Sequence, residues 1–551
     1  MKRKIQHPSI ADEKVVFIPL KDGLHVVDRR TTGETPFSLA SWRHLVKPVL
    51  ILDKWVTHES EMIDAILSLD TIHATNGQQE DRMLINITAI VVDNIKCEKG
   101  WQMLAHAIAA DPQNDMSASK GWLRTLSFTK HSLLYAISQI DNDPYTRAFF
   151  HGLTLPSCSL VALRFEGVSF QNTWQLFCDS VARCRSLEHL TVSVNHSNEA
   201  ERLMDIVDAV TNSSSRVSLR TLDLSALWHS RPHSWNDIPP PLSLINCFLS
   251  GETALCQNRM ARLEIPFPNL PNLPSPIARA RYLRYAQPLC HALSRAHSPL
   301  QSFTIDQIDL QSAATILKAP NLISFHCRET FKKVCGGPWS DLIDPLSKSC
   351  IQDLTLSAHE LGVPMTVFQA IFLHPTLTNV DLSGWYNVDN ETKVIELLQH
   401  PNFGIKTLVL GGSVPYWNTM LSLRLNHSLT FFSCGLFHSD SKDLSNCWNA
   451  FADVIKFNTT LTVLNAAPPI VRDETLSSCV NNVINALSQN CTLVECELPS
   501  GFSYQTQTQL CMTILHSNLT LQHSPCSYIR MPLDRPLIDD RITYNRVRSN
   551  L

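Results

Sequence analysis

Cys335 is the candidate nucleophile that stands out, because it lies in the segment FKKVCGGPW at residues 331–339. Lys332 and Lys333 would favour its thiolate, and the two glycines that follow leave backbone N–H groups open to a bound anion. A Gly-Gly-Pro loop turn explains the same letters, and no His or acidic partner can be assigned to Cys335. The sequence therefore leaves open a cysteine-dependent enzyme, ubiquitin-ligase-like or hydrolytic, that uses Cys335 or a compact N-terminal domain.

Other patterns that carry chemistry are missing from the sequence. Its seventeen cysteines include no Cys-x-x-Cys pair and no His/Cys spacing typical of a metal site. Gly-rich phosphate loops, His-Glu-x-x-His and Gly-x-Ser-x-Gly do not occur. We therefore expect no cofactor, no metal and no catalysis, and we interpret most cysteines as free thiols that pack as small hydrophobes in a reducing compartment.

Composition excludes several classes of protein. An apolar content of 44% excludes wholesale disorder, and charged residues at 17% with a net charge of -4 argue against a nucleic-acid partner. No stretch approaches the roughly 20 apolar residues that span a bilayer. The basic start MKRKIQHPSIADEK has no apolar region behind it and does not resemble a secretory signal. The predicted location is cytoplasmic, in the producing cell or in a host cell.

A repeat in the sequence predicts the strands and helices that would position any functional site. NTTLTVLNA at 458–466 and NCTLVECEL at 490–498 share an L-x-x-L-x-L register that recurs about fifteen times. Its last two apolar residues alternate with polar ones, as in a half-buried strand. Apolar stripes at helical spacing lie between these strands at 392–400, 450–457 and 479–489. The first apolar residues of the units are Ile87, Leu123, Leu160, Leu187, Leu219, Met260, Leu300, Leu322, Ile351, Leu377, Ile405, Leu429, Leu461, Leu493 and Leu521.

The motif Asn-x-(Ser/Thr)-Leu opens several of these units. Asparagine tolerates the left-handed conformation that ends a helix, and a hydroxyl two residues later can bond turn backbone. The motif therefore predicts a helix stop joined to a strand start. The same letters fit N-glycosylation at Asn426, Asn458, Asn490 and Asn518.

A short strand followed by a helix, repeated with buried leucines, resembles the leucine-rich-repeat family, and the period is most similar to its ribonuclease-inhibitor subtype. The resemblance implies an α/β solenoid, a curved horseshoe with parallel strands on the concave face and helices on the convex face. Family members place Asn or Cys three residues after the third leucine to bond between turns. That place holds Leu227, Trp385, Ser413 or Pro469 here, with Asn195 a rare match. We therefore expect the backbone between turns to be satisfied differently.

Three segments are predicted. Residues 1–82 form an N-terminal cap or a small α+β domain, with a hairpin over KVVFIPLKDGLHVVD and a helix over 58–69. Residues 83–526 form the leucine-rich-repeat array, and 527–551 form a C-terminal cap or tail. The two flanking segments are too short for the appended catalytic domain of bacterial leucine-rich-repeat ubiquitin ligases.

The predicted function is a non-catalytic protein-protein interaction scaffold, either a microbial effector acting in a host cell or an intracellular regulator. Side chains that alternate with the buried leucines would line the concave face and bind a protein partner. Acidic residues outnumber basic ones there, which favours a partner with a basic patch; the neutral alternative is a solvated sheet face. The predicted binding residues are Arg164, Asp223, Arg262, Glu264, Asp306, His326, Arg328, Asp353, Asp381, Glu495 and Glu497.

Overall fold

A computed structural model of the 551-residue chain divides into two compact units, and each is described by itself. Unit 1 comprises Met1–Asn269 with His297–Leu300, and unit 2 comprises Leu270–Ala296 with Gln301–Leu551. The described residues are 15–19, 25–29, 48–52, 89–92, 98–109, 121, 123–128, 145–166, 173–194, 205–211, 219–226, 260–265, 287–295, 298–330, 338–356, 363–383, 391–411, 416–434, 444–466, 477–496 and 521.

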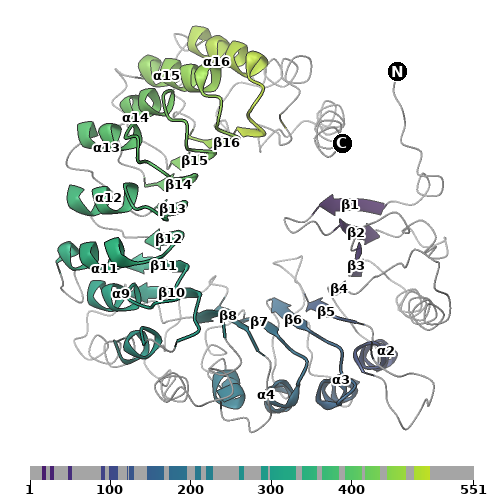
Figure 1. The fold of residues 1–551 in the computed structure, drawn as a ribbon. Coiled ribbons are helices and arrows are strands. Elements are labelled where there is room, and N and C mark those ends of the chain that lie inside the picture. The colour runs from purple at the N-terminus through teal and green to yellow at the C-terminus, as the bar shows by residue number, and fades with distance from the viewer. Residues whose placement is uncertain are drawn as a thin grey trace, which may run out of the picture. The chain divides into compact units, whose positions relative to one another are not determined.

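Unit 1 alternates short strands with helices (Figure 1). Strands β2 to β9 pair in parallel, each with the next along the chain. Helices α2, α3 and α4 pack side by side. The elements are β1 (Val15–Pro19), β2 (His25–Arg29), β3 (Pro48–Leu52), β4 (Ala89–Val92), α2 (Glu98–Ile108), β5 (Thr125–Phe128), α3 (Tyr145–Thr154), β6 (Ala162–Glu166), α4 (Trp174–Arg183), β7 (His189–Val194), β8 (Thr221–Ala226) and β9 (Arg262–Ile265).

Unit 2 repeats the arrangement, with strands β10 to β17 paired in parallel in chain order. Helices lie on one side of these strands (Figure 1). The elements are β10 (Ser302–Ile308), α9 (Leu310–Ile316), β11 (Ser324–Thr330), the 3-10 helix η3 (Trp339–Leu342), α11 (Ile343–Lys348), β12 (Asp353–Leu356), α12 (Met365–Phe372), β13 (Asn379–Leu382), α13 (Glu391–Leu398), β14 (Thr407–Leu410), α14 (Tyr416–Leu423), β15 (Phe431–Cys434), α15 (Leu444–Phe457), β16 (Val463–Asn465), α16 (Ser477–Gln489) and β17 (Glu495–Cys496). The predicted α/β repeat solenoid is confirmed.

The core of each unit is a set of in-register rows that cross the strands. In unit 2, one row of side chains is at most 1% exposed and consists of Phe303, Phe325, Leu354, Val380, Leu408, Phe432, Leu464 and Cys496. In unit 1, the corresponding buried row runs through Leu126, Leu163, Leu190, Leu222 and Leu263. Because successive strand residues point to opposite faces, the residues on either side of each row face away from the helices.

The first apolar residue of each repeat is buried throughout the described part of the chain. From Leu123 to Leu521, every one of these residues is at most 1% exposed; Ile87 lies outside the described residues. The predicted helices at 392–400, 450–457 and 479–489 correspond to α13, α15 and α16. The repeat register in the sequence therefore identifies the core side chains of the array.

Neighbouring turns are joined by a backbone carbonyl just before the strand, at β5 to β8 in unit 1 and at β10 to β16 in unit 2. The carbonyl of Thr462, which follows Leu461, accepts the N–H groups of Val494 at 2.7 Å and Glu495 at 3.1 Å. The carbonyl of Thr430 accepts Thr462 N at 2.7 Å and Val463 N at 3.1 Å in the same way. This doubly accepting carbonyl recurs in unit 1, for example at Val161. It provides a contact between turns that differs from the asparagine position expected of the family.

The turn asparagines also bridge neighbouring coils. Asn458 donates from Nδ2 to the carbonyls of Leu423 at 2.7 Å and Asn426 at 2.9 Å. Its Oδ1 accepts the N–H groups of Thr460 and Leu461 at 2.9 and 2.8 Å. One buried amide thus binds the preceding coil and shapes its own turn.

Asn426 and Asn490 repeat this pattern. Asn426 donates to the carbonyl of Leu398 at 2.7 Å, and Asn490 donates to the carbonyl of Ile455 at 2.6 Å. All three turn asparagines are at most 8% exposed. A glycan on a buried Nδ2 that donates to the preceding coil is incompatible with this packing, which favours the turn interpretation at these positions. Asn518 lies outside the described residues.

The predicted N-terminal hairpin is present as antiparallel pairing of β1 with β2, in which Val15 lies opposite Arg29; its turn at 20–24 lies outside the described residues. β2 also pairs in parallel with β3, and β3 with β4. Parallel pairing therefore begins N-terminal to residue 83. The predicted helix over 58–69 and the tail 527–551 lie outside the described residues, and the three-segment division stays a prediction.

Adjacent residues of β14 separate core from surface. Leu408 is fully buried, whereas Val409 is half-buried on the opposite face. We expect Leu408→Ala to lower the free energy of unfolding by about 2–5 kcal/mol, because it leaves a cavity in the core row. Val409→Ala should cost less than about 1.5 kcal/mol, since it removes two half-buried methyl groups. Urea unfolding followed by far-UV circular dichroism measures both values, and equal losses would contradict the assigned register.

The bridging role of Asn458 predicts a large effect for a small substitution. Asn458→Ala leaves the N–H groups of Thr460 and Leu461 without their acceptor and removes one donor from each of two carbonyls of the preceding coil, so we expect a loss of about 1–3 kcal/mol. Asn481, which is exposed on α16, provides the matched control, and Asn481→Ala should change the free energy of unfolding by about 0.5 kcal/mol or less. The urea midpoints of unfolding measure both changes. An unchanged midpoint for Asn458→Ala would contradict the bridging role.

Candidate functional site

The candidate site is the strand face, defined as the two rows of strand side chains that point away from the helices in each unit. In unit 2 the first row is Ser302, Ser324, Asp353, Asn379, Thr407, Phe431, Val463 and Glu495. The second row is Thr304, His326, Thr355, Asp381, Val409, Ser433 and Asn465. In unit 1 the first row includes His189, Thr221 and Arg262. The second row includes Arg164, Thr191, Asp223 and Glu264.

The predicted binding residues are divided between the strand faces of unit 1 and unit 2. Arg164, Asp223, Arg262 and Glu264 lie on unit 1, and His326, Asp353, Asp381 and Glu495 lie on unit 2. Asp306 and Arg328 belong to β10 and β11, where the structure describes only their backbone. Glu497 lies outside the described residues. The structure thus gives side-chain environments for eight of the predicted residues, and whether they bind a partner stays a prediction.

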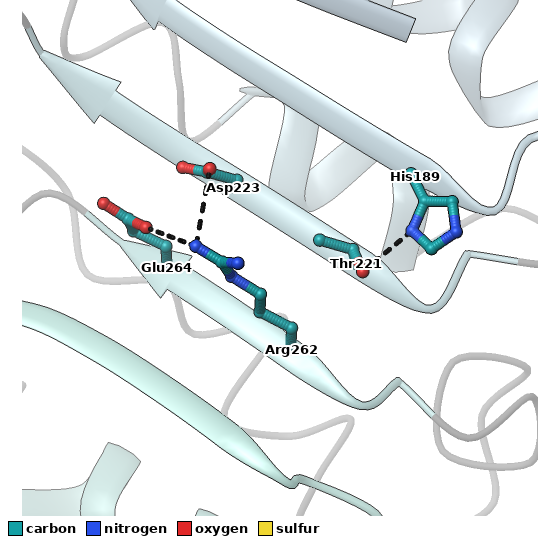
Figure 2. Close-up of polar contacts among 5 residues, drawn as sticks. All are labelled: His189, Thr221, Asp223, Arg262 and Glu264. Atoms are coloured by element: carbon teal, nitrogen blue, oxygen red, sulfur yellow. Dashed lines mark hydrogen bonds and ion pairs between the residues drawn. The ribbon is translucent and has the colours of Figure 1, made fainter. Parts of the chain in front are cut away.

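In unit 1, two carboxylates and an arginine meet on neighbouring strands (Figure 2). Arg262 Nη2 lies 3.5 Å from Glu264 Oε2 and 4.0 Å from Asp223 Oδ2. Glu264 is only 7% exposed although it faces away from the helices. Nearby, His189 Nδ1 lies 3.0 Å from Thr221 Oγ1. Arg262 therefore offsets part of the acidic charge of this cluster from within the sheet.

The environment of Asp223 makes its carboxyl titrate near neutral pH. Burial, together with the charge and hydrogen bond of Glu264, raises its pKa to about 6, although Arg262 and Arg164 oppose the increase. A raised pKa means that the folded chain keeps this proton after the unfolded chain has lost it. The cluster therefore contributes stability that is present below about pH 4 and is lost as the pH rises through about 6.

In unit 2, the acidic side chains are held by neutral partners. Asp353 accepts a hydrogen bond from Ser324 Oγ at 2.7 Å and another from Asn379 Nδ2. Asp381 accepts the N–H of Ser383 at 2.9 Å, and Glu495 accepts Asn465 Nδ2 at 3.3 Å. None of the three carboxylates forms an ion pair with another residue that the structure describes. Their charges are oriented by these hydrogen bonds and are not neutralised by any cation in the described ranges.

An apolar group lies among these acids and was not anticipated from charge patterning. Val409, Phe431 and Val463 are half-buried on β14, β15 and β16. Asp381 pairs with Val409 across one boundary of the group, and Glu495 pairs with Val463 across the other. The sequence contained the signal, because these residues occupy the same alternating positions as the acids. These three side chains carry no charge, so the charge pattern did not mark them.

Other candidate chemistry can be placed only in part. Cys335 lies outside the described residues, so the structure does not test it as a nucleophile. Across the described ranges, no group of three or more His, Cys, Asp and Glu side chains could hold a metal ion. Among the helices that the structure describes, none has the length and apolar character needed to cross a membrane.

No protein-family model matches the sequence, and no curated protein matches it.

The raised pKa of Asp223 gives a pH-dependent prediction. Asp223→Asn removes the carboxyl that must ionise against burial and Glu264, so the variant should gain about 1–3 kcal/mol in free energy of unfolding relative to wild type between about pH 4 and pH 7. Urea unfolding at intervals across this range measures the difference. A stability difference that stays constant with pH would show that Asp223 ionises in the folded chain as it does in the unfolded one.

Proposed function

We propose that the chain is a non-catalytic scaffold that binds a protein partner on the strand face of unit 2. The observation that carries this proposal is the pattern of its two rows, in which Asp381 and Glu495 flank the apolar group of Val409, Phe431 and Val463, and Asp353 lies two strands beyond β14 in the first row. These residues are not needed to complete the core, because the buried rows fill it. Half-buried apolar side chains bordered by carboxylates that pair with no cation among the described residues are typical of a surface that another molecule covers.

The chemistry of the surface defines the partner. Asp381 and Glu495 lie on β13 and β17, four strand spacings apart, which corresponds to about 19 Å at about 4.8 Å per spacing. The complementary segment carries apolar side chains at its centre and Lys or Arg on both sides. Apolar contact supplies affinity, while the flanking charges fix the register and speed association.

The finer family and cellular role belong to the same proposal. Parallel strands that alternate with helices at intervals of roughly 30 residues support a leucine-rich-repeat scaffold of the ribonuclease-inhibitor-like subtype. We infer that it acts in a cytoplasm, either as an intracellular regulator or as a microbial effector in a host cell. The free thiols among the described cysteines agree with a reducing compartment.

A peptide library displayed on phage and selected against the full-length chain tests the proposal. We expect the enriched peptides to carry basic residues on both sides of an apolar centre. The triple substitution Asp353→Asn, Asp381→Asn, Glu495→Gln should weaken binding of a labelled enriched peptide about tenfold, at roughly 0.5 kcal/mol for each charge. Fluorescence anisotropy at low and at high salt measures the change, and high salt should weaken the wild-type complex.

A matched control changes the same charge on the helices. Asp344, Glu396 and Asp453 are solvent-accessible acids on α11, α13 and α15, so Asp344→Asn, Glu396→Gln, Asp453→Asn also removes three negative charges. This variant should bind the enriched peptide within about twofold of wild type. Enrichment of acidic peptides, or loss of binding in the helix variant alone, would contradict binding at the strand face.

A further inference from the structure

Unit 1 contains a pair of cysteines whose sulfur atoms are in contact across neighbouring coils. Cys158 Sγ lies 3.9 Å from Cys184 Sγ, although 26 positions separate the two residues in sequence. Cys158 follows α3 and precedes β6, whereas Cys184 caps the C-terminus of α4 and precedes β7. Both residues belong to unit 1. The contact therefore joins two turns that hold equivalent places in successive repeats.

Cys184 lies three residues before the first apolar residue of its repeat, Leu187, as Asn458 lies three residues before Leu461. Asn458 connects its turn to the preceding coil by hydrogen bonds. Cys184 makes the corresponding connection through sulfur. A position that is purely structural in unit 2 is therefore occupied in unit 1 by a group that can form a covalent bond.

We propose that Cys158 and Cys184 form an oxidation site at which a hydroperoxide converts the thiol pair into a disulfide between two neighbouring coils. The sulfur atoms need to approach by about 1.9 Å to reach the S–S bond length of about 2.05 Å. Both cysteines lie in turns between a helix and a strand, where a rotation about the Cα–Cβ bond and a small backbone shift can supply this movement. The loop closed by the disulfide contains β6 and α4.

The surroundings assign different roles to the two thiols. Cys158 is 8% exposed and Cys184 is 1% exposed, so Cys158 is the sulfur that a small oxidant reaches first. Hydrogen bonds from the Cys184 thiol, the Ser186 hydroxyl and the Leu160 N–H lower the pKa of Cys158 to about 6 against the opposing effect of burial. Contact with Cys158 and burial raise the pKa of Cys184. The surroundings therefore favour deprotonation of Cys158 over deprotonation of Cys184.

The reaction is balanced with hydrogen peroxide as the oxidant. The Cys158 thiolate attacks one peroxide oxygen, the O–O bond breaks, and the sulfenic acid of Cys158 forms together with hydroxide. The hydroxide takes the proton of Cys184, and the resulting sulfur attacks the Cys158 sulfur as the S–O bond breaks. The sulfenic oxygen leaves as water after gaining a proton. Two thiols and one peroxide give one disulfide and two water molecules, and the sulfurs together lose two electrons.

The test uses the folded full-length chain. It is treated with hydrogen peroxide, its remaining thiols are blocked with N-ethylmaleimide, and its peptides are mapped by mass spectrometry without reduction. We expect a cross-linked peptide that joins Cys158 to Cys184 at about 2 Da below the sum of the reduced peptides, and its disappearance after reduction. Oxidation of the exposed Cys350 and Cys491 without this cross-link would overturn the proposal.

Variants distinguish the two roles. Cys184→Ser should abolish the cross-link and leave a Cys158 sulfenic acid that dimedone traps, whereas Cys158→Ser should abolish both products. Cys178→Ser is the matched control, because Cys178 is also buried in unit 1 and its thiol pKa is raised by burial and by nearby Asp205. It should leave the cross-link unchanged. Dimedone labelling of Cys184 in the Cys158→Ser variant would reverse the assigned roles and contradict the proposal. Where a variant fails to fold, the peptide map of the oxidised wild-type chain decides the outcome.

Discussion

The hydrogen bonds between neighbouring coils are the constraint on which the rest of the molecule depends. A single repeat has too little apolar surface to fold alone, so each coil must dock on the preceding one in a fixed register. The doubly accepting carbonyl before β5 to β8 and before β10 to β16 sets that register. The buried amides of Asn426, Asn458 and Asn490 reinforce it and end the preceding helix at the same time. Without this register, the leucines of successive repeats would not form continuous buried rows.

A fixed register also determines the strand face. Because side chains alternate across a strand, aligning the buried rows aligns the outer rows as well. Residues far apart in sequence, such as Asp353 and Glu495, then belong to one row. The two units use this arrangement differently. Arg262 is paired with both Asp223 and Glu264 in unit 1, whereas neutral side chains hold the acids of unit 2. The same architecture thus gives one internally paired cluster and one acidic surface.

The turn before each strand shows how one structural position can hold different chemistry. Asparagine suits it because one amide both donates to the preceding coil and accepts from its own turn. His374 makes a comparable contact with the carbonyl of Leu346 at 2.8 Å. Cys184 replaces these hydrogen bonds by a sulfur contact with Cys158. Polar side chains at this position stabilise the stack, and the thiol pair adds the capacity for a covalent link.

The sequence by itself determined the repeat, its strands and helices, and the identity of the buried leucines, because burial on one face imposes a local periodicity that one chain displays openly. It also indicated Asp223, Asp353, Asp381 and Glu495 as surface residues. The tertiary structure decided which of these charges are paired, that Val409, Phe431 and Val463 lie between Asp381 and Glu495, and that Cys158 contacts Cys184. Those facts depend on atoms about 20–30 residues or more apart in the chain, and their distances are set by the docking of coils rather than by any local pattern.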